Sequence, residues 1–225
     1  MIVGDAMTFR ETTMSAEEPR DGACWRCDQR VELLHTCESC HAPQPLPADT
    51  DHFAVLGLRR ALVVDGADLE RRYHDASRLV HPDRHQNGDA EALRLSVTTS
   101  AAVNRAYRTL REPVARGRYW LELHGRALAK DNNRVPPALA TRVFEVQELL
   151  EELRDESRSG IRADVEAAHA EITGRLETRR KELEECYRRW SDATSEAVLD
   201  ELKLRLSEIA YLWTLSRDVD EALES

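Results

Sequence analysis

Apolar side chains recur at the spacing of an α-helix through most of this chain, and this pattern restricts it to an all-helical fold. Towards the C-terminus, three such stripes run over residues 139–153, 161–190 and 198–219, separated by short polar breaks. Three long antiparallel helices joined by short turns form a bundle. Only 5% of the 225 residues are aromatic and nine are glycine, which favours helices over a β-barrel or a sandwich.

The region before the bundle also reads as helices, and residues at their ends mark the boundaries. A short helix over 52–56 is expected to follow an aspartate or threonine cap and to end at Gly57. The next helix begins after Asp65 and is stopped by Pro82. A third is expected over residues 89–110. Its apolar face is expected to include Leu93, Val97, Val103, Ala106, Tyr107 and Leu110.

Between the second and third of these helices the chain carries His81, Pro82 and Asp83. On its own, such a tripeptide would be an ordinary capped turn. Pro82 restricts the backbone, so His81 and Asp83 are presented with little conformational entropy left to lose on docking. An ionised aspartate at this place can form a charge-assisted hydrogen bond with an arginine of a partner protein. The position between two amphipathic helices favours a docking role.

The helix before this turn carries a local strip of arginines, although the formal net charge of the chain is -10. Arg71, Arg72 and Arg78 lie on its polar face, and Arg84 follows the turn. Such a strip suits an acidic surface on a partner protein. The chain as a whole lacks the basic footprint expected of a protein that binds nucleic acid or an anionic membrane.

Four of the five cysteines form two Cys-x-x-Cys pairs, Cys24 with Cys27 and Cys37 with Cys40. Each pair places two thiolates on the same side of a tight turn, and together they supply four sulfurs at the corners of a tetrahedron, which suits zinc. Iron can occupy the same ligands, and two disulfides or four idle thiols are the alternatives. A closed metal site would fold a segment that has no core of its own. Cys186 stands apart, at helical spacing, and is expected to be buried.

The hairpin region resembles a J-domain. Besides the His-Pro-Asp turn, the segment 103–110 is similar to the third helix of J-domains and the segment 51–58 to their opening helix. The resemblance extends over residues 49–112. It implies a domain that performs no chemistry itself and instead stimulates the ATPase of a DnaK-type, HscA-like chaperone. The chaperone-binding residues that it implies are His81, Pro82, Asp83, Arg71, Arg72 and Arg78.

The segment 113–125, expected as a fourth helix that begins at Pro113 and closes at Gly125, resembles HscB-type co-chaperones of iron–sulfur cluster biogenesis. The helical C-terminal bundle fits that family, and the cysteine module looks like the N-terminal extension of its eukaryote-type members. The resemblance covers about residues 23–223. It implies an L-shaped protein in which a J-domain hairpin and a three-helix bundle follow a small zinc-knuckle module.

In this family the bundle holds an IscU-type iron–sulfur scaffold protein and delivers it to the chaperone. The resemblance places an apolar and acidic patch on the first bundle helix and an aromatic side chain on the last. The scaffold-binding residues that it implies are Val143, Phe144, Gln147, Glu148, Glu151 and Tyr211. Gln147 stands where the family often has an apolar residue, and Tyr211 where Phe is common. Val143 is expected to be half core and half surface, and Phe144 to point off the buried stripe.

The expected organisation is a flexible tail over 1–22, a tetracysteine module over 23–42, a Pro-rich linker over 43–48, a J-domain with its connecting helix over 49–125 and a bundle over 126–225. No apolar run is long enough to span a bilayer. The N-terminal residues include four acidic side chains and no continuous apolar block, so neither a secretory signal nor a transit peptide is expected. Cytoplasm is the expected location, with the mitochondrial matrix as the alternative, and the chain is expected to be a monomer or weak dimer.

Two other functions fit parts of the sequence. A zinc-containing regulator that binds nucleic acid would use the cysteine module, but acidic and basic residues are mixed there, which makes a poor phosphate-binding surface. A thiol-disulfide oxidoreductase would use Cys24 and Cys27. The sequence carries no P-loop, nucleophile elbow or Gly-rich cradle. We therefore expect no enzymatic activity of its own.

Overall fold

The computed structural model describes residues 22–32, 34–86, 88–128, 136–155, 159–190 and 194–224. Over these ranges the chain forms helices and short turns and contains no β-strand. The prediction of an all-helical fold is therefore confirmed. The expected tail up to residue 21 and the start of the polar break between the second and third bundle stripes, at 191–193, lie outside the described residues.

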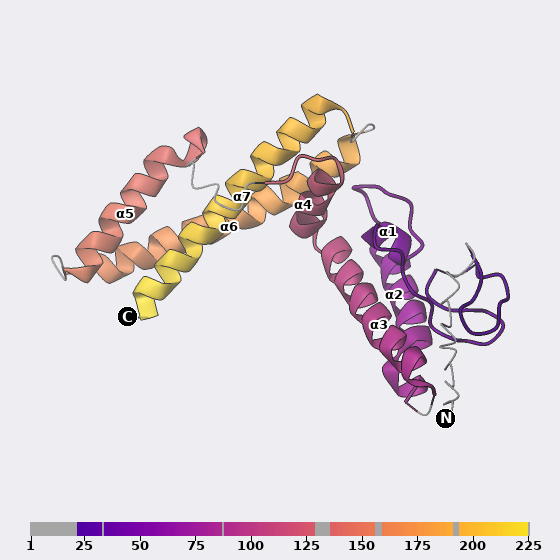
Figure 1. Ribbon diagram of the computed structural model, residues 1–225. Coiled ribbons are helices and arrows are strands. Elements are labelled where there is room, and N and C mark those ends of the chain that lie inside the picture. The colour runs from indigo at the N-terminus through magenta and orange to yellow at the C-terminus, as the bar shows by residue number, and fades with distance from the viewer. Residues whose placement is uncertain are drawn as a thin grey trace, which may run out of the picture.

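One arm of the molecule is a helical hairpin. It consists of α2 (Gly66–Val80) and α3 (Ala90–Arg111), with the one-turn helix α1 (His52–Val55) packed against α3 (Figure 1). Aspartate side chains cap the start of each helix by accepting backbone N–H groups: Asp51 caps α1, Asp65 caps α2 and Asp89 caps α3.

The expected apolar face of α3 is wrong over its first half. Leu93 and Val97 are exposed, and other side chains of this half are buried instead. They are Leu95 and the smaller or more polar Ala92, Ser96 and Thr99. The buried hydroxyls find acceptors close by: Ser96 donates to the Leu93 carbonyl at 2.7 Å. Apolar spacing alone could not identify this face, because polar residues with backbone partners occupy part of it.

The two arms meet at α4 (Pro113–Leu123), which packs against α3, α6 and α7 (Figure 1). Glu112 caps its first turn, and Gly125 has a left-handed backbone at φ 67° just after its end, as expected. Arg116 is buried, donates to the Leu110 carbonyl at 2.6 Å and lies over the ring of Tyr187 on α6. The helix is therefore fixed to both arms by packing and by hydrogen bonds.

The second arm is the bundle. It contains the 3₁₀ turn η2 (Pro137–Leu139), then α5 (Ala140–Arg154), α6 (Ile161–Arg189) and α7 (Glu196–Glu224). The long helices α6 and α7 run side by side, and the shorter α5 packs on their outer end (Figure 1). Cys186 is buried in α6, as expected, and its sulfur accepts a hydrogen bond from Arg189 at 3.0 Å.

One continuous group of buried apolar side chains runs from α1 through α4 to the outer end of the bundle. The cysteine module has a separate and much smaller one, in which Cys24, Cys37 and Ala42 are buried with Trp25 and Val31 packed against them. Among the described residues, no helix is both long and apolar enough to cross a membrane.

Candidate functional site

The His-Pro-Asp turn lies at the free tip of the α2–α3 hairpin, in the 3₁₀ turn η1 (Pro82–Arg84). The side chains of His81 and Asp83 are 54% and 71% exposed. Nδ1 of His81 accepts a hydrogen bond from the Asp83 N–H at 3.3 Å, and Gln86 donates to the Asp83 carboxylate at 2.8 Å. These two contacts hold the His81 ring and the Asp83 carboxylate in place while both remain exposed. The turn therefore offers a preorganised docking surface to a partner.

The arginines on α2 differ in how tightly the protein itself holds them. Arg72 donates to the Gly57 carbonyl at 2.7 Å and to the Asp68 carboxylate at 2.9 Å, so it ties α2 to the end of α1. Arg71 pairs with the same carboxylate and is exposed. Arg78 is exposed in the last turn of α2, three residues before His81. Arg78 is therefore well placed beside the hairpin tip, whereas Arg72 also braces the fold.

The expected scaffold patch lies at the outer end of the bundle, on α5 and α7. Phe144 is 62% exposed, and Gln147, Glu148 and Glu151 are exposed on the same helix. Tyr211 on α7 is half-buried.

Val143 is 4% exposed, so the expectation that it is half surface is wrong. It belongs to the buried stripe with Val146 and Leu150, which faces α6 and α7. Phe144, the next residue along the helix, points about a quarter turn away, as expected. Among the six scaffold-binding residues that the resemblance implies, Val143 is therefore a core residue.

An open groove of about 1360 Å³ lies between α5, the first turn of α6 and the last turns of α7, and no pattern in the sequence indicated it. Gln147 and Glu151 line it from α5, and Asp218 lines it from α7. Burial and the negative charge of Asp218 both raise the pKa of Tyr211, which lies seven residues before Asp218 on the same face of the helix. Asp218 thus belongs to the expected scaffold patch. The sequence could have indicated this residue, because it follows Tyr211 by two helical turns on the same face.

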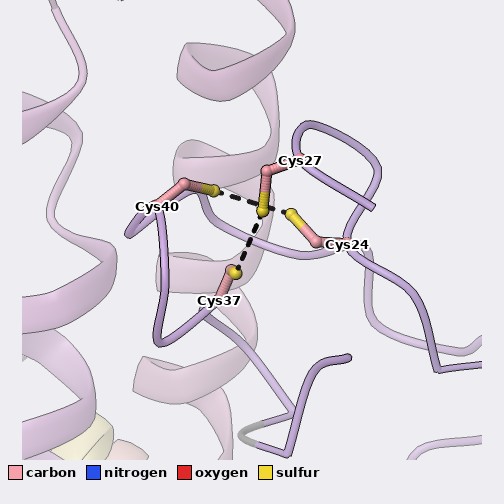
Figure 2. A group of neighbouring side chains, drawn as sticks. All are labelled: Cys24, Cys27, Cys37 and Cys40. Carbon is pink, nitrogen blue, oxygen red and sulfur yellow. Dashed lines mark hydrogen bonds between the residues drawn. The ribbon is translucent and has the colours of Figure 1, made fainter. Parts of the chain in front are cut away.

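The four N-terminal cysteines converge on one point (Figure 2). The sulfurs of Cys24 and Cys40 lie 3.6 Å apart, those of Cys27 and Cys37 lie 3.7 Å apart, and all four lie within 4.8 Å of one another. A disulfide would need about 2.05 Å between sulfurs. Tetrahedral zinc, with Zn–S bonds of about 2.3 Å, needs about 3.8 Å. The spacing fits a single four-coordinate metal ion, and it does not fit two disulfides.

The two Cys-x-x-Cys knuckles have the same backbone geometry. The residue after each pair, Asp28 or His41, has a left-handed backbone, with φ of 62° and 56°. Its N–H donates to the carbonyl of the first cysteine of the pair, at 3.0 Å from Asp28 to Cys24 and at 2.9 Å from His41 to Cys37. This tight turn is what brings both thiols of a pair to the same side.

The surroundings shift the pKa values of these thiols in opposite directions. Burial acts to raise the pKa of Cys24, but the N–H groups of Arg26 and Cys27 lower it to about 7. Burial and the hydrogen bonds with neighbouring sulfurs raise the pKa of Cys40 to about 12. Four thiolates in one small cluster repel one another, and a divalent cation removes that cost. The donor set is therefore suited to a structural metal ion.

No protein-family model matches this chain. Individual relatives do. The chain is 28% identical over 174 residues to the iron–sulfur cluster co-chaperone protein HscB homolog of Arabidopsis thaliana, a match that covers 77% of this chain and 62% of the relative. It is 32% identical over 139 residues to the co-chaperone protein HscB homolog of Bordetella petrii, which covers 61% of this chain and 76% of the relative. The match thus spans less than two thirds of the Arabidopsis protein.

The crystal structure of human co-chaperone protein HscB has the same architecture. Its TM-score with this chain is 0.66 at 28% sequence identity, and the comparison covers 88% of this chain and 97% of the human one. The likeness therefore extends well beyond the hairpin into the bundle. On these sequence and structural relationships, the chain belongs to the HscB family of co-chaperone proteins.

Proposed function

We propose that this protein is a co-chaperone that stimulates the ATPase of a DnaK-type, HscA-like chaperone during iron–sulfur cluster assembly. The observation that carries the proposal is the His-Pro-Asp turn, exposed and oriented at the tip of a helical hairpin. Family membership supports it, because the relatives are named as iron–sulfur cluster co-chaperones. In this role the protein performs no chemistry of its own.

The second half of the proposed function is delivery of an IscU-type scaffold protein to the chaperone. Phe144 offers an exposed aromatic anchor, and Glu148 and Glu151 add negative charge beside it. Asp218 lines the same groove from α7, and Tyr211 lies close enough to Asp218 to be influenced by its charge. An apolar centre with an acidic margin suits a scaffold surface that pairs apolar and basic side chains.

The proposed role of the tetracysteine site is structural, with zinc as the metal and iron as the alternative on the same four sulfurs. Four sulfur ligands close the coordination shell and keep no position for a substrate. This arrangement also speaks against a thiol-disulfide oxidoreductase, because sulfurs that hold a metal are not free to attack a disulfide. Elemental analysis of the purified protein, with one metal ion per chain as the expected result, distinguishes the two.

The experiment that tests the co-chaperone function is a steady-state ATPase assay with purified DnaK-type chaperones and the scaffold protein. We expect this protein to raise the rate of hydrolysis by its cognate chaperone, and His81→Gln to abolish the increase while leaving the fold intact. His124→Gln, at the end of α4 and away from the hairpin tip, is the matched control. Stimulation that persists in His81→Gln would contradict the proposed role of the turn. We place this activity in the cytoplasm or the mitochondrial matrix.

A further inference from the structure

The segment that follows the cysteine module is in contact with the hairpin. Residues 43–48 were expected to form a linker, yet Pro43 is buried and Gln44 is only 4% exposed. The ring N–H of Trp25 donates to the Pro43 carbonyl at 2.7 Å, which holds the start of this segment against the module. In Figure 1 the module and this segment lie beside the α2–α3 hairpin.

Gln44 contacts both the cysteine cluster and α3. Its side-chain Nε2 donates to the sulfur of Cys24 at 3.3 Å and to the Ala42 carbonyl at 2.8 Å. Its backbone carbonyl accepts a hydrogen bond from the hydroxyl of Thr99, in the middle of α3, at 3.4 Å. Thr99 is itself buried. The sulfur of Cys24 in the module and the hydroxyl of Thr99 on α3 therefore both have Gln44 as a hydrogen-bond partner.

A second contact joins the module to the start of α3. The Arg26 guanidinium lies 3.8 Å from the carboxylate of Asp89, which caps α3 by accepting the Ala92 N–H at 2.7 Å. Both charged side chains are nearly half exposed, so this pair contributes little by itself. The buried hydrogen bonds of Gln44 carry more weight. Together the two contacts reach the first half of α3, which follows directly after the hairpin tip.

We propose that Gln44 couples metal binding at the tetracysteine site to the stability of the first half of α3. Metal-bound thiolates concentrate negative charge, and an N–H donor in the outer shell disperses it and orients the ligand. A module with so small a core needs the metal in order to fold. When the metal is lost, Gln44 loses the sulfur that holds its amide, and the buried Thr99 hydroxyl loses its acceptor.

Linkage makes this coupling work in both directions. If bound metal stabilises the contact between Gln44 and Thr99, then breaking that contact from the α3 side must weaken metal retention. A neutral hydrogen bond of ordinary strength corresponds to a factor of about 2 to 10. Removing an outer-shell donor directly costs more, on the order of 10- to 100-fold in metal affinity. A Gln44 variant should therefore lose more metal affinity than a Thr99 variant.

The first experiment measures the Zn²⁺ affinity of the full-length protein by equilibrium competition with a chromogenic chelator. Thr99→Val keeps the shape of the side chain and removes only the donor. We expect it to bind Zn²⁺ about 2 to 10 times more weakly than the unmodified protein, and Gln44→Leu to bind it more weakly still.

Thr98→Val is the matched control. Thr98 is the adjacent residue on the same helix, is exposed, and donates to the Arg94 carbonyl within α3. It should bind Zn²⁺ with the unmodified affinity. Equal affinities for Thr99→Val, Thr98→Val and the unmodified protein would overturn the proposal.

The second experiment needs no variant, so it decides the matter even if a substituted protein folds poorly. Hydrogen exchange is followed by mass spectrometry in the Zn²⁺-loaded protein and after the metal is stripped. We expect faster exchange over residues 90–99 and unchanged exchange in α6 and α7. Unchanged exchange over 90–99, or an equal rise throughout the chain, would contradict the proposal. Neither measurement depends on the co-chaperone activity.

Discussion

The hydroxyl of Tyr187 on α6 lies where a β-carbon on Gly117 of α4 would have to go. That hydroxyl also donates to the Pro113 carbonyl at 2.9 Å, in the first turn of α4. The absence of a side chain at Gly117 thus lets α4 approach α6 closely enough for this hydrogen bond.

Gly117→Ala is therefore expected to destabilise the protein by about 1–3 kcal/mol, because the added carbon would displace the buried Tyr187 side chain from its hydrogen bond with the Pro113 carbonyl. Gly174→Ala on α6 is the control: no atom lies within 4 Å of the added carbon, so it should stabilise by about 0.5–1 kcal/mol. Chemical denaturation of both variants measures the difference. A Gly117→Ala protein as stable as the unmodified one would show that α4 does not need this approach.

Two adjacent residues of α5 are expected to respond in opposite ways. Val143→Ala should lower the free energy of unfolding by about 1–3 kcal/mol, because it removes buried methyl groups from the core. Phe144→Ala should leave stability within about 0.5 kcal/mol and weaken binding of the scaffold protein by roughly tenfold or more. Thermal unfolding and isothermal titration calorimetry separate the two effects. Scaffold binding unchanged in Phe144→Ala would exclude this residue from the interface.

The arginines of α2 give a similar contrast. Arg72→Ala removes hydrogen bonds to Gly57 and Asp68 and should cost about 1 kcal/mol of stability. Arg78→Ala should leave the melting temperature unchanged and reduce stimulation of the chaperone ATPase, since Arg78 lies exposed beside the hairpin tip. Calorimetry and the ATPase assay distinguish these outcomes. The proposed docking surface would need revision if Arg78→Ala stimulated as well as the unmodified protein.

The pH dependence of stability should carry a contribution from Asp51. Burial acts to raise the pKa of this carboxyl, but hydrogen bonds from the Ala54 N–H and the Arg60 side chain outweigh it and hold the pKa below its ordinary value of 3.8. The stabilisation by the ionised form is fully present above pH 3.8 and is lost as the pH falls through the lowered pKa.

Asp51→Asn is therefore expected to cost about 0.2–1 kcal/mol at pH 7, because asparagine can still cap α1 and only the ion pair with the exposed Arg60 is lost. The difference from the unmodified protein should shrink as the pH falls below the ordinary aspartate pKa. Urea denaturation across this pH range measures it. A difference that stays constant with pH would mean that the charge of Asp51 does not contribute.

The boundaries of the helices could be predicted because local residues determine them. Gly57 has the left-handed backbone expected of it, at φ 63°, and Asp65 caps α2 as expected. The cysteine spacing likewise indicated the metal site, since the geometry of a knuckle is local. The exposed hairpin tip followed from the placement of His81 between two helices.

The parts that could not be predicted depend on contacts between distant segments. Which face of α3 is buried depends on Gln44, 55 residues earlier in the chain, whose carbonyl accepts from Thr99. The burial of Val143 depends on how α5 lies on α6 and α7. The close approach of Gly117 to Tyr187 brings together residues whose spacing in the sequence carries no pattern.

The contacts of α4 with both arms have a consequence for the proposed function. Under that proposal, a scaffold protein held on α5 and a chaperone docked at the tip of the α2–α3 hairpin would lie at opposite ends of the molecule (Figure 1). If α4 keeps the two arms at this angle, the chaperone would be reached by an extended stretch of the scaffold protein while its body stays docked.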